Sequence, residues 1–166
     1  MKKFLIASLA AAVVLSAGAA WAKNDLVILT QDELFNDAQI VFDGNFNSLQ
    51  LLQEHTGGAG ANVINATITG DGNGGPIGSA FTGAALGASL EPGTLTQRGF
   101  DNSMAINVVG TDNLFAFAQN GSGTSLSASI IGMNNQAAVL QVGSNNHAGF
   151  SQNGIGNTVN IVQRSW

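Results

Sequence analysis

The chain contains no cysteine and only two prolines among its 166 residues. Without cysteine, neither a disulfide framework nor a cysteine-based metal site is available. Both prolines, Pro76 and Pro92, lie in one segment rich in glycine, alanine and serine. The stability of the fold must therefore come from backbone hydrogen bonds and packing.

Charged residues are few and unevenly placed. All ten acids lie between Asp25 and Asp112, and residues 113–163 contain no Lys, Arg, Asp, Glu or Pro. A net charge of -5 favours no nucleic-acid partner. In an ordinary soluble protein, an uncharged, proline-free stretch of alternating apolar residues is an aggregation hazard. Here the stretch indicates a chain built to self-assemble.

Motifs of catalysis are also missing. The sequence has no Gly-x-Ser-x-Gly, no His-Glu-x-x-His and no P-loop, so we expect no enzyme, no catalytic residue and no cofactor. His55 and His147 have no His, Cys or carboxylate at the spacing of metal ligands, which favours surface positions over a metal site. Residues 70–75 resemble a calcium-binding glycine/aspartate turn, but such turns recur in solenoids and this one occurs once, which favours a plain loop.

What the sequence has instead is an eleven-residue repeat. A glycine recurs at constant spacing, usually with Gln two places before it and Asn three places after it, so that the unit reads Gln-x-Gly-x-x-Asn. Glycine accepts the positive φ that a tight turn demands. The predicted turn glycines are Gly99, Gly110, Gly121, Gly132, Gly143 and Gly154.

Between each Asn and the next Gln, apolar residues occupy every second position. A period of two is typical of a β-strand, in which alternate side chains share one face. Each unit is therefore predicted to be a strand followed by a turn, with the apolar residues inside. The predicted core residues are Phe115, Phe117, Val139, Phe150, Val159 and Ile161.

Glutamine ends every second strand, whereas the strands between end in Val108, Ile130 and Gln152. The true period is therefore 22 residues, which predicts an all-β solenoid of rungs stacked about 4.7–4.8 Å apart, each with two strands. Stacked side-chain amides would satisfy one another, and turn capping alone would not explain Gln at the far end of a strand. Thr124, Val108 and Ile130 would interrupt these ladders. The predicted ladder and self-assembly residues are Gln97, Asn102, Asn113, Gln119, Asn135, Gln141, Asn146, Gln152, Asn157 and Gln163.

Four segments precede or contain these repeats. Residues 1–22 have the basic start, apolar run and Ala-Trp-Ala ending of a signal peptide, with cleavage expected after Ala22, and the apolar run is too short for a membrane anchor. Residues 23–35 form a leader, read either as a cap or as a handle for export. Residues 36–90 hold degenerate repeats and a glycine-rich loop, which is read either as one distorted rung or as a flexible bulge, with the bulge favoured at its start. Residues 91–166 hold the regular repeats.

The repeat resembles the curlin repeat of bacterial curli subunits, most completely over residues 141–152. The resemblance covers residues 95–163 well and 36–68 loosely. It implies export through the periplasm and an outer-membrane pore with accessory chaperones, and a homopolymer, joined by a second curlin subunit. The fibres would be extracellular amyloid at the cell surface, serving biofilm matrix, adhesion and surface colonisation. Whether the chain is a major or a minor, nucleating subunit stays open, with a slight lean to the minor type.

Two other function classes remain. A monomeric secreted solenoid that acts as an adhesin or binds ice or glycan would share the period, but it should show a flat outward row of Thr or aromatic residues. The outward residues are instead small. A glycan hydrolase would need gathered carboxylates, and the regular array has only Asp101 and Asp112, both in turns. The outward positions are Ala105, Ala116, Ser127, Ala138, Gly149 and Asn160.

Overall fold

The chain winds into a stack of parallel strands in a computed structural model that describes residues 3–7, 12–17, 25–32 and 35–166. The predicted cleavage site after Ala22 lies outside these residues. No helix among them is long and apolar enough to cross a membrane. The strands are β1 (Lys3–Ala7), β2 (Ala12–Ala17), β3 (Leu26–Asp32), β4 (Asn36–Asp43), β5 (Ser48–His55), β6 (Asn62–Asp71), β7 (Thr94–Phe100), β8 (Ser103–Thr111), β9 (Leu114–Ser122), β10 (Ser125–Met133), β11 (Gln136–Ser144), β12 (His147–Ile155) and β13 (Thr158–Arg164).

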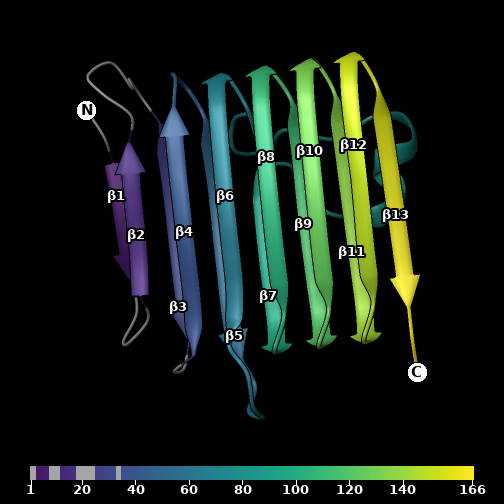
Figure 1. Cartoon of the computed structure of the whole chain (residues 1–166). Coiled ribbons are helices and arrows are strands. Elements are labelled where there is room, and N and C mark those ends of the chain that lie inside the picture. The colour runs from purple at the N-terminus through teal and green to yellow at the C-terminus, as the bar shows by residue number, and fades with distance from the viewer. Residues whose placement is uncertain (1–2, 8–11, 18–24, 33–34) are drawn as a thin grey trace.

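The odd-numbered strands form one seven-stranded parallel sheet, here sheet A, and the even-numbered strands form a six-stranded parallel sheet, sheet B. Successive strands alternate between the two sheets, so each rung has one strand in each (Figure 1). In sheet A, Gln119 pairs with Gln141 and Gln141 with Gln163, a step of 22 residues. The predicted all-β solenoid with a 22-residue period is confirmed.

The register holds through the irregular half of the chain as well. Asn36 pairs with Asn62 in sheet B, across the longer loop at residues 56–61. Strand β3 lies within the predicted leader and pairs with β5. Strands β1 and β2 lie within the predicted signal peptide and pair with β3 and β4. Both outermost strands of the stack, β1 and β13, belong to sheet A.

The core lies between the two sheets. Phe115, Phe117 and Val139 are fully buried there. Phe150 packs edge-on against Phe117 but is only partly buried, and Val159 and Ile161 are partly buried too. These three residues lie on β12 and β13, the last strands of the stack, which have a neighbour on one side only. The exposure of the last rung follows from its position.

The turn glycines are required for two reasons, their backbone conformation and the close approach of neighbouring rungs. All six have positive φ, from 100° to 152°, a conformation that residues with a Cβ rarely adopt. A Cβ on Gly99 or Gly121 would also overlap the carbonyl oxygen of the glycine one rung further on, Gly121 or Gly143. Gly154 has no such neighbour, because no rung of this chain follows it. The glycines therefore permit stacking as well as turning.

Residues 75–92, here the surface segment, are inserted into a sheet A strand. Asn73 already occupies its place in that sheet, and the strand resumes at Thr94. The segment contains the 3-10 helix η1 (Gly83–Ala88) and packs its Phe81 and Ala85 on the outer side of sheet A. It lies outside the strand and covers part of the outer face of sheet A. The outward residues Ala116 and Ala138 are buried beneath it, which explains why they are small.

Candidate functional site

Six glutamines form a continuous column inside sheet A, from β3 to β13. The Nε2 of each except the last donates to the Oε1 of the glutamine on the next rung toward the C-terminus, at 2.6–2.9 Å. Since all but the last are buried, these bonds satisfy groups that would cost about 1–3 kcal/mol each if unpaired. The members are Gln31, Gln53, Gln97, Gln119, Gln141 and Gln163.

Five of these glutamines, from Gln53 to Gln163, also join the two sheets. The second N–H of the Gln119 Nε2 donates to the carbonyl of Ser103 in sheet B, and that of Gln141 donates to Ser125, both at 3.0 Å. A buried amide therefore uses both N–H groups and its carbonyl. Such full satisfaction favours one register over its neighbours, because a slip would unpair several groups together.

Asparagines form a second column in sheet A, at the start of each strand. The Nδ2 of Asn135 donates to the Oδ1 of Asn113 at 3.0 Å, and that of Asn157 to Asn135 at 3.1 Å. These bonds point toward the N-terminus, opposite to the glutamine bonds. The second N–H of Asn135 donates to the carbonyl of Gly154, which links the Asn and Gly of the repeat. The column is Asn47, Asn73, Asn113, Asn135 and Asn157.

The corresponding column in sheet B is less complete. Asn62 donates to Asn36 and Asn102 donates to Asn62. Thr124 does not interrupt the column on this side, because its Oγ1 donates to Asn102 Oδ1 at 2.7 Å. The predicted ladder residue Asn146 instead donates to the Val142 carbonyl and the Ser165 hydroxyl. The break falls between Thr124 and Asn146.

Gln152 departs most from the predicted ladder. It pairs with Ile130, so the structure does not bring it next to another glutamine. Its Nε2 donates to the Gln136 carbonyl, whereas its buried Oε1 has no hydrogen-bond partner among the described residues. Gln152 lies on β12, the last strand of sheet B, where the next rung would begin.

Some ladder positions were absent from the sequence prediction. Gln31 lies in the predicted leader, and Asn73 is separated from the rest of its strand by the surface segment. Asp25 occupies the start of the Asn column, because its Oδ1 accepts the backbone N–H of Asn47 at 2.8 Å. The sequence signal that could have identified Gln31 and Asp25 is the step of 22 residues from Gln31 to Gln53 and from Asp25 to Asn47.

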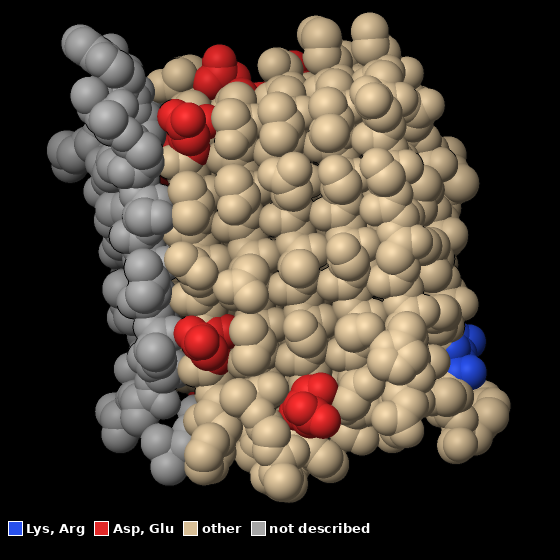
Figure 2. Space-filling view, viewed as in Figure 1, with Lys and Arg blue, Asp and Glu red and all other residues tan. Residues whose placement is uncertain are grey.

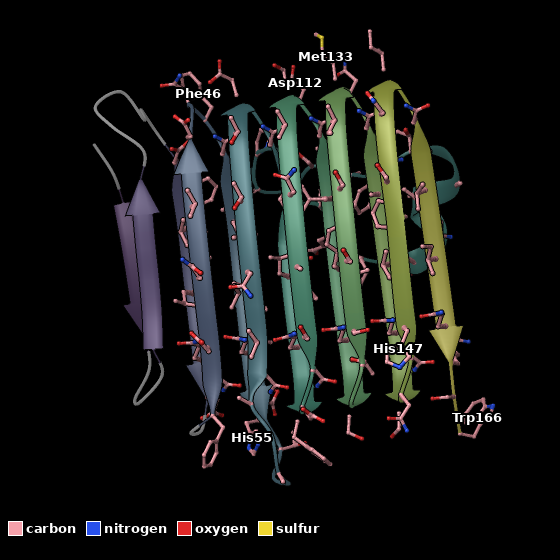
Figure 3. The ribbon with its side chains drawn as sticks, viewed as in Figure 1. Phe46, His55, Asp112, Met133, His147 and Trp166 are labelled. Carbon is pink, nitrogen blue, oxygen red and sulfur yellow. The ribbon has the colours of Figure 1, made fainter. Side chains whose placement is uncertain are left out.

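The two histidines lie at the turn end of the stack opposite Asp112 and Met133 (Figure 3). The Nδ1 of His147 lies 2.6 Å from the Ser125 hydroxyl, and the ring of His55 lies 5.5 Å from that of Phe35. The described residues contain no group of three or more His, Cys, Asp or Glu that could hold a metal ion.

Comparison with known proteins gives one match. The family model of the curlin associated repeat matches residues 132–164, which span the end of β10 and all of β11, β12 and β13. No curated protein and no solved structure matches the chain. The matched residues include two Gln and two Asn of the sheet A columns. The resemblance to the curlin family is thereby confirmed, on the curlin associated repeat that residues 132–164 contain.

Proposed function

We propose that the chain is a secreted structural subunit that polymerises with itself into extracellular curli-like amyloid fibres, which serve biofilm matrix, adhesion and surface colonisation. The observation that carries the proposal is the open edge at β13. Its residues Asn157 and Gln163 bond back to Asn135 and Gln141, and no strand of the described residues lies beyond β13. A strand edge with unpaired backbone groups is a template for another chain.

The composition of this edge supports the same proposal. Natural soluble proteins protect sheet edges with charge, proline or a covering element. Strand β13 contains no proline, and its one charged residue is Arg164 at its end. A contact of one end of the stack with the other end of a second copy does not close on itself, so it generates an open filament.

Export is part of the proposal. Residues 1–22 act as a signal peptide that is removed, and the processed chain passes through the periplasm to the cell surface. A second curlin subunit, an outer-membrane pore and accessory chaperones are its proposed partners. The ladder residues and turn glycines are the proposed self-assembly residues, and residues 91–166 are the proposed template region.

Thioflavin-T fluorescence of the processed chain, followed by fibre diffraction, tests the proposal. We expect growth after a lag, and a meridional spacing of about 4.7–4.8 Å along the fibre. Seeds lacking residues 23–68 should shorten the lag if the regular repeats are the template. A chain that stays monomeric and β-rich for days contradicts the proposal. It would favour a ligand-binding solenoid, whose ligand could lie in the groove on the outer side of β3, β5 and β7.

A further inference from the structure

The outer face of sheet A is divided into a bare half and a covered half. Its outward residues include two columns, one from Ile28 to Asn160 and the other from Thr30 to Val162, with one residue of each column on every strand from β3 to β13. The surface segment packs over these columns on β9 and β11, and its η1 lies over β13. The same columns on β3, β5 and β7 line an open groove instead.

The bare half forms a shallow groove of about 250 Å³. Ile28 and Leu52 are half-buried in it, and none of the side chains that line it is charged. This volume is below the range of about 300–1,000 Å³ that is usual for a small-molecule pocket, so it suits one or two apolar side chains better than a cofactor. The outward side chains along the groove are Ile28, Thr30, Gln50, Leu52, Thr94 and Thr96.

The tip of the surface segment holds an apolar side chain next to the last strand. Helix η1 packs Ala85 and Ala88 against sheet A, and both are buried. A Cβ on Gly87 would lie 2.5 Å from the Asn160 Nδ2, so η1 rests directly on the outer side of β13. Between these residues, Leu86 is 58% exposed. One exposed leucine is ordinary on a protein surface, so its significance depends on what lies beside it.

In a head-to-tail stack, the groove of the next copy lies beside η1. The register that continues the glutamine column places Gln31 of the second copy next to Gln163. Ile28 and Asn160 each lie three positions before these glutamines, so the same register places Ile28 of the second copy next to Asn160. Because η1 rests on Asn160, the first residue of the groove then lies one strand spacing, about 4.7–4.8 Å, beyond the strand that η1 covers.

We propose that the surface segment bridges successive copies of the chain, and that Leu86 of η1 packs into the groove on β3, β5 and β7 of the next copy. The inference rests on the proposed function and on removal of residues 1–22, because β1 pairs with β3 in the full chain. The contact removes apolar surface of both copies from water. It buries no charged group, since residues 75–90 and the groove contain none.

A second copy in the same fibre is the occupant that the geometry favours. The segment and the groove lie on the same two columns, so the stacking that continues sheet A also brings them together. This contact gives a reason why a segment that leaves the stack near β7 extends as far as β13. A segment from a neighbouring fibre would need a separate lateral contact to reach the groove.

Cross-linking between introduced cysteines tests the contact, because the chain has none of its own. Fibres of the Leu86→Cys, Ile28→Cys variant of the processed chain should give ladders of linked chains with a short bis-maleimide. The two sites of one chain are too far apart to be linked, since β3 and β13 are five strand spacings apart, about 24 Å. Every link therefore joins two copies.

The control variant pairs Leu86→Cys with Gln39→Cys, at a residue exposed on the outer face of sheet B. Figure 2 shows this face, and most of its surface is uncharged like the groove, so charge would not prevent linkage there. Equal linkage in the control would contradict the contact. Linkage found in bundled fibres, but not in fibres that run singly in electron micrographs, would assign the groove to a neighbouring fibre and overturn the proposal.

Replacement of Leu86 tests whether the contact stabilises the fibre. We expect Leu86→Ser to raise the concentration of free chain in equilibrium with the fibres about fivefold, at a fixed denaturant concentration, because less apolar surface is buried at each joint. Ile77→Ser is the matched control, since Ile77 is 63% exposed on the same segment but precedes η1. Its effect should stay below about twofold.

An unchanged concentration for Leu86→Ser would overturn the inference, and so would an equal rise for Ile77→Ser, because a general loss of apolar surface would then explain the effect. In both cases fibres that keep the spacing of about 4.7–4.8 Å would leave the proposed function standing. If the unaltered chain forms no fibres, the proposed function fails and the inference with it.

Discussion

The side chain of a ladder glutamine bonds to the glutamine of the preceding rung, to that of the following rung and to the opposite sheet. It is therefore not equivalent to an ordinary polar side chain. Gln119 accepts from Gln97, donates to Gln141 and donates to the Ser103 carbonyl. In Gln119→Ala, the buried Gln141 Oε1 loses its donor, which we expect to cost about 1–3 kcal/mol. The measurement is the denaturant midpoint for dissolution of the fibres.

The exposed Gln39 offers a matched control, because it points away from the core on β4. Gln39→Ala should change the midpoint by less than about 0.5 kcal/mol in equivalent free energy. Similar shifts in the two variants would show that the amide column contributes little to stability.

Glycine has two different roles in the stack, and alanine substitution separates them. Gly121 has a φ of 152°, and a Cβ there would overlap the carbonyl of Gly143. Gly149 lies within β12, and the nearest atom to its added Cβ would be the Ser127 oxygen at 3.9 Å. We expect Gly121→Ala to prevent regular stacking, and Gly149→Ala to be tolerated.

Circular dichroism and fibre diffraction of the two variants check this expectation. Retention of the 4.7–4.8 Å reflection and of β-content in Gly121→Ala, at the level of Gly149→Ala, would show that the backbone can move apart at the turn. The close approach of the glycines would then be unnecessary for stacking.

At the scale of elements, the surface segment supports strands far from its own place in the chain. It leaves the stack near β7 but packs over Ala116 on β9 and Ala138 on β11, and its Gly87 lies next to Asn160 on β13. Its Thr82 also exchanges two hydrogen bonds with Gln136, both at 2.7 Å. The segment therefore adds a second contact to β13, which has only one neighbouring strand.

Phe81 anchors this segment and is 3% exposed. Phe81→Ala should remove about 3–5 kcal/mol of packing from the segment, as is usual for such a buried side chain. We expect faster backbone amide exchange in residues 75–92 and in β13, with little change in β6 and β8. Leu86→Ala is a suitable control because Leu86 lies in the same segment but is 58% exposed. Unchanged exchange in β13 would contradict the supporting role.

The elements were predictable where the spacing is constant. From Gly99 to Gly154 the constant step of eleven residues predicts the positions of the strands, the side chains that face the core and the stacking of the rungs, because each turn has the same length. The position of Asn73 was not predictable, because the surface segment separates it from its strand. Gln31 and Asp25 were not predicted as ladder positions because no turn glycine precedes β3. The packing of Phe81 depends on tertiary contact with sheet A, which the local repeat of the sequence does not indicate.

At the scale of the whole molecule, charge follows position in the stack. The acids occur before the regular repeats or in their first turns, and residues 113–163 are uncharged. Strand β13 at the C-terminal end therefore carries one charged residue, Arg164, whereas Asp25 lies in the side-chain column next to β3. The two ends differ, so a fibre made from this chain has a direction.

That both outermost strands belong to sheet A has a consequence for such a fibre. Copies joined through sheet A continue that sheet, but β12 and the next β4 remain separated by the width of one missing strand. Sheet B would then have a gap of one strand in each copy. A chain without residues 1–22 would have six sheet A strands, the seven less β1, which would give an axial period of about 28 Å. Retention of residues 1–22 would keep β1 and lengthen the axial period to about 33 Å. The axial period of the fibre would therefore show whether residues 1–22 had been removed from its subunits.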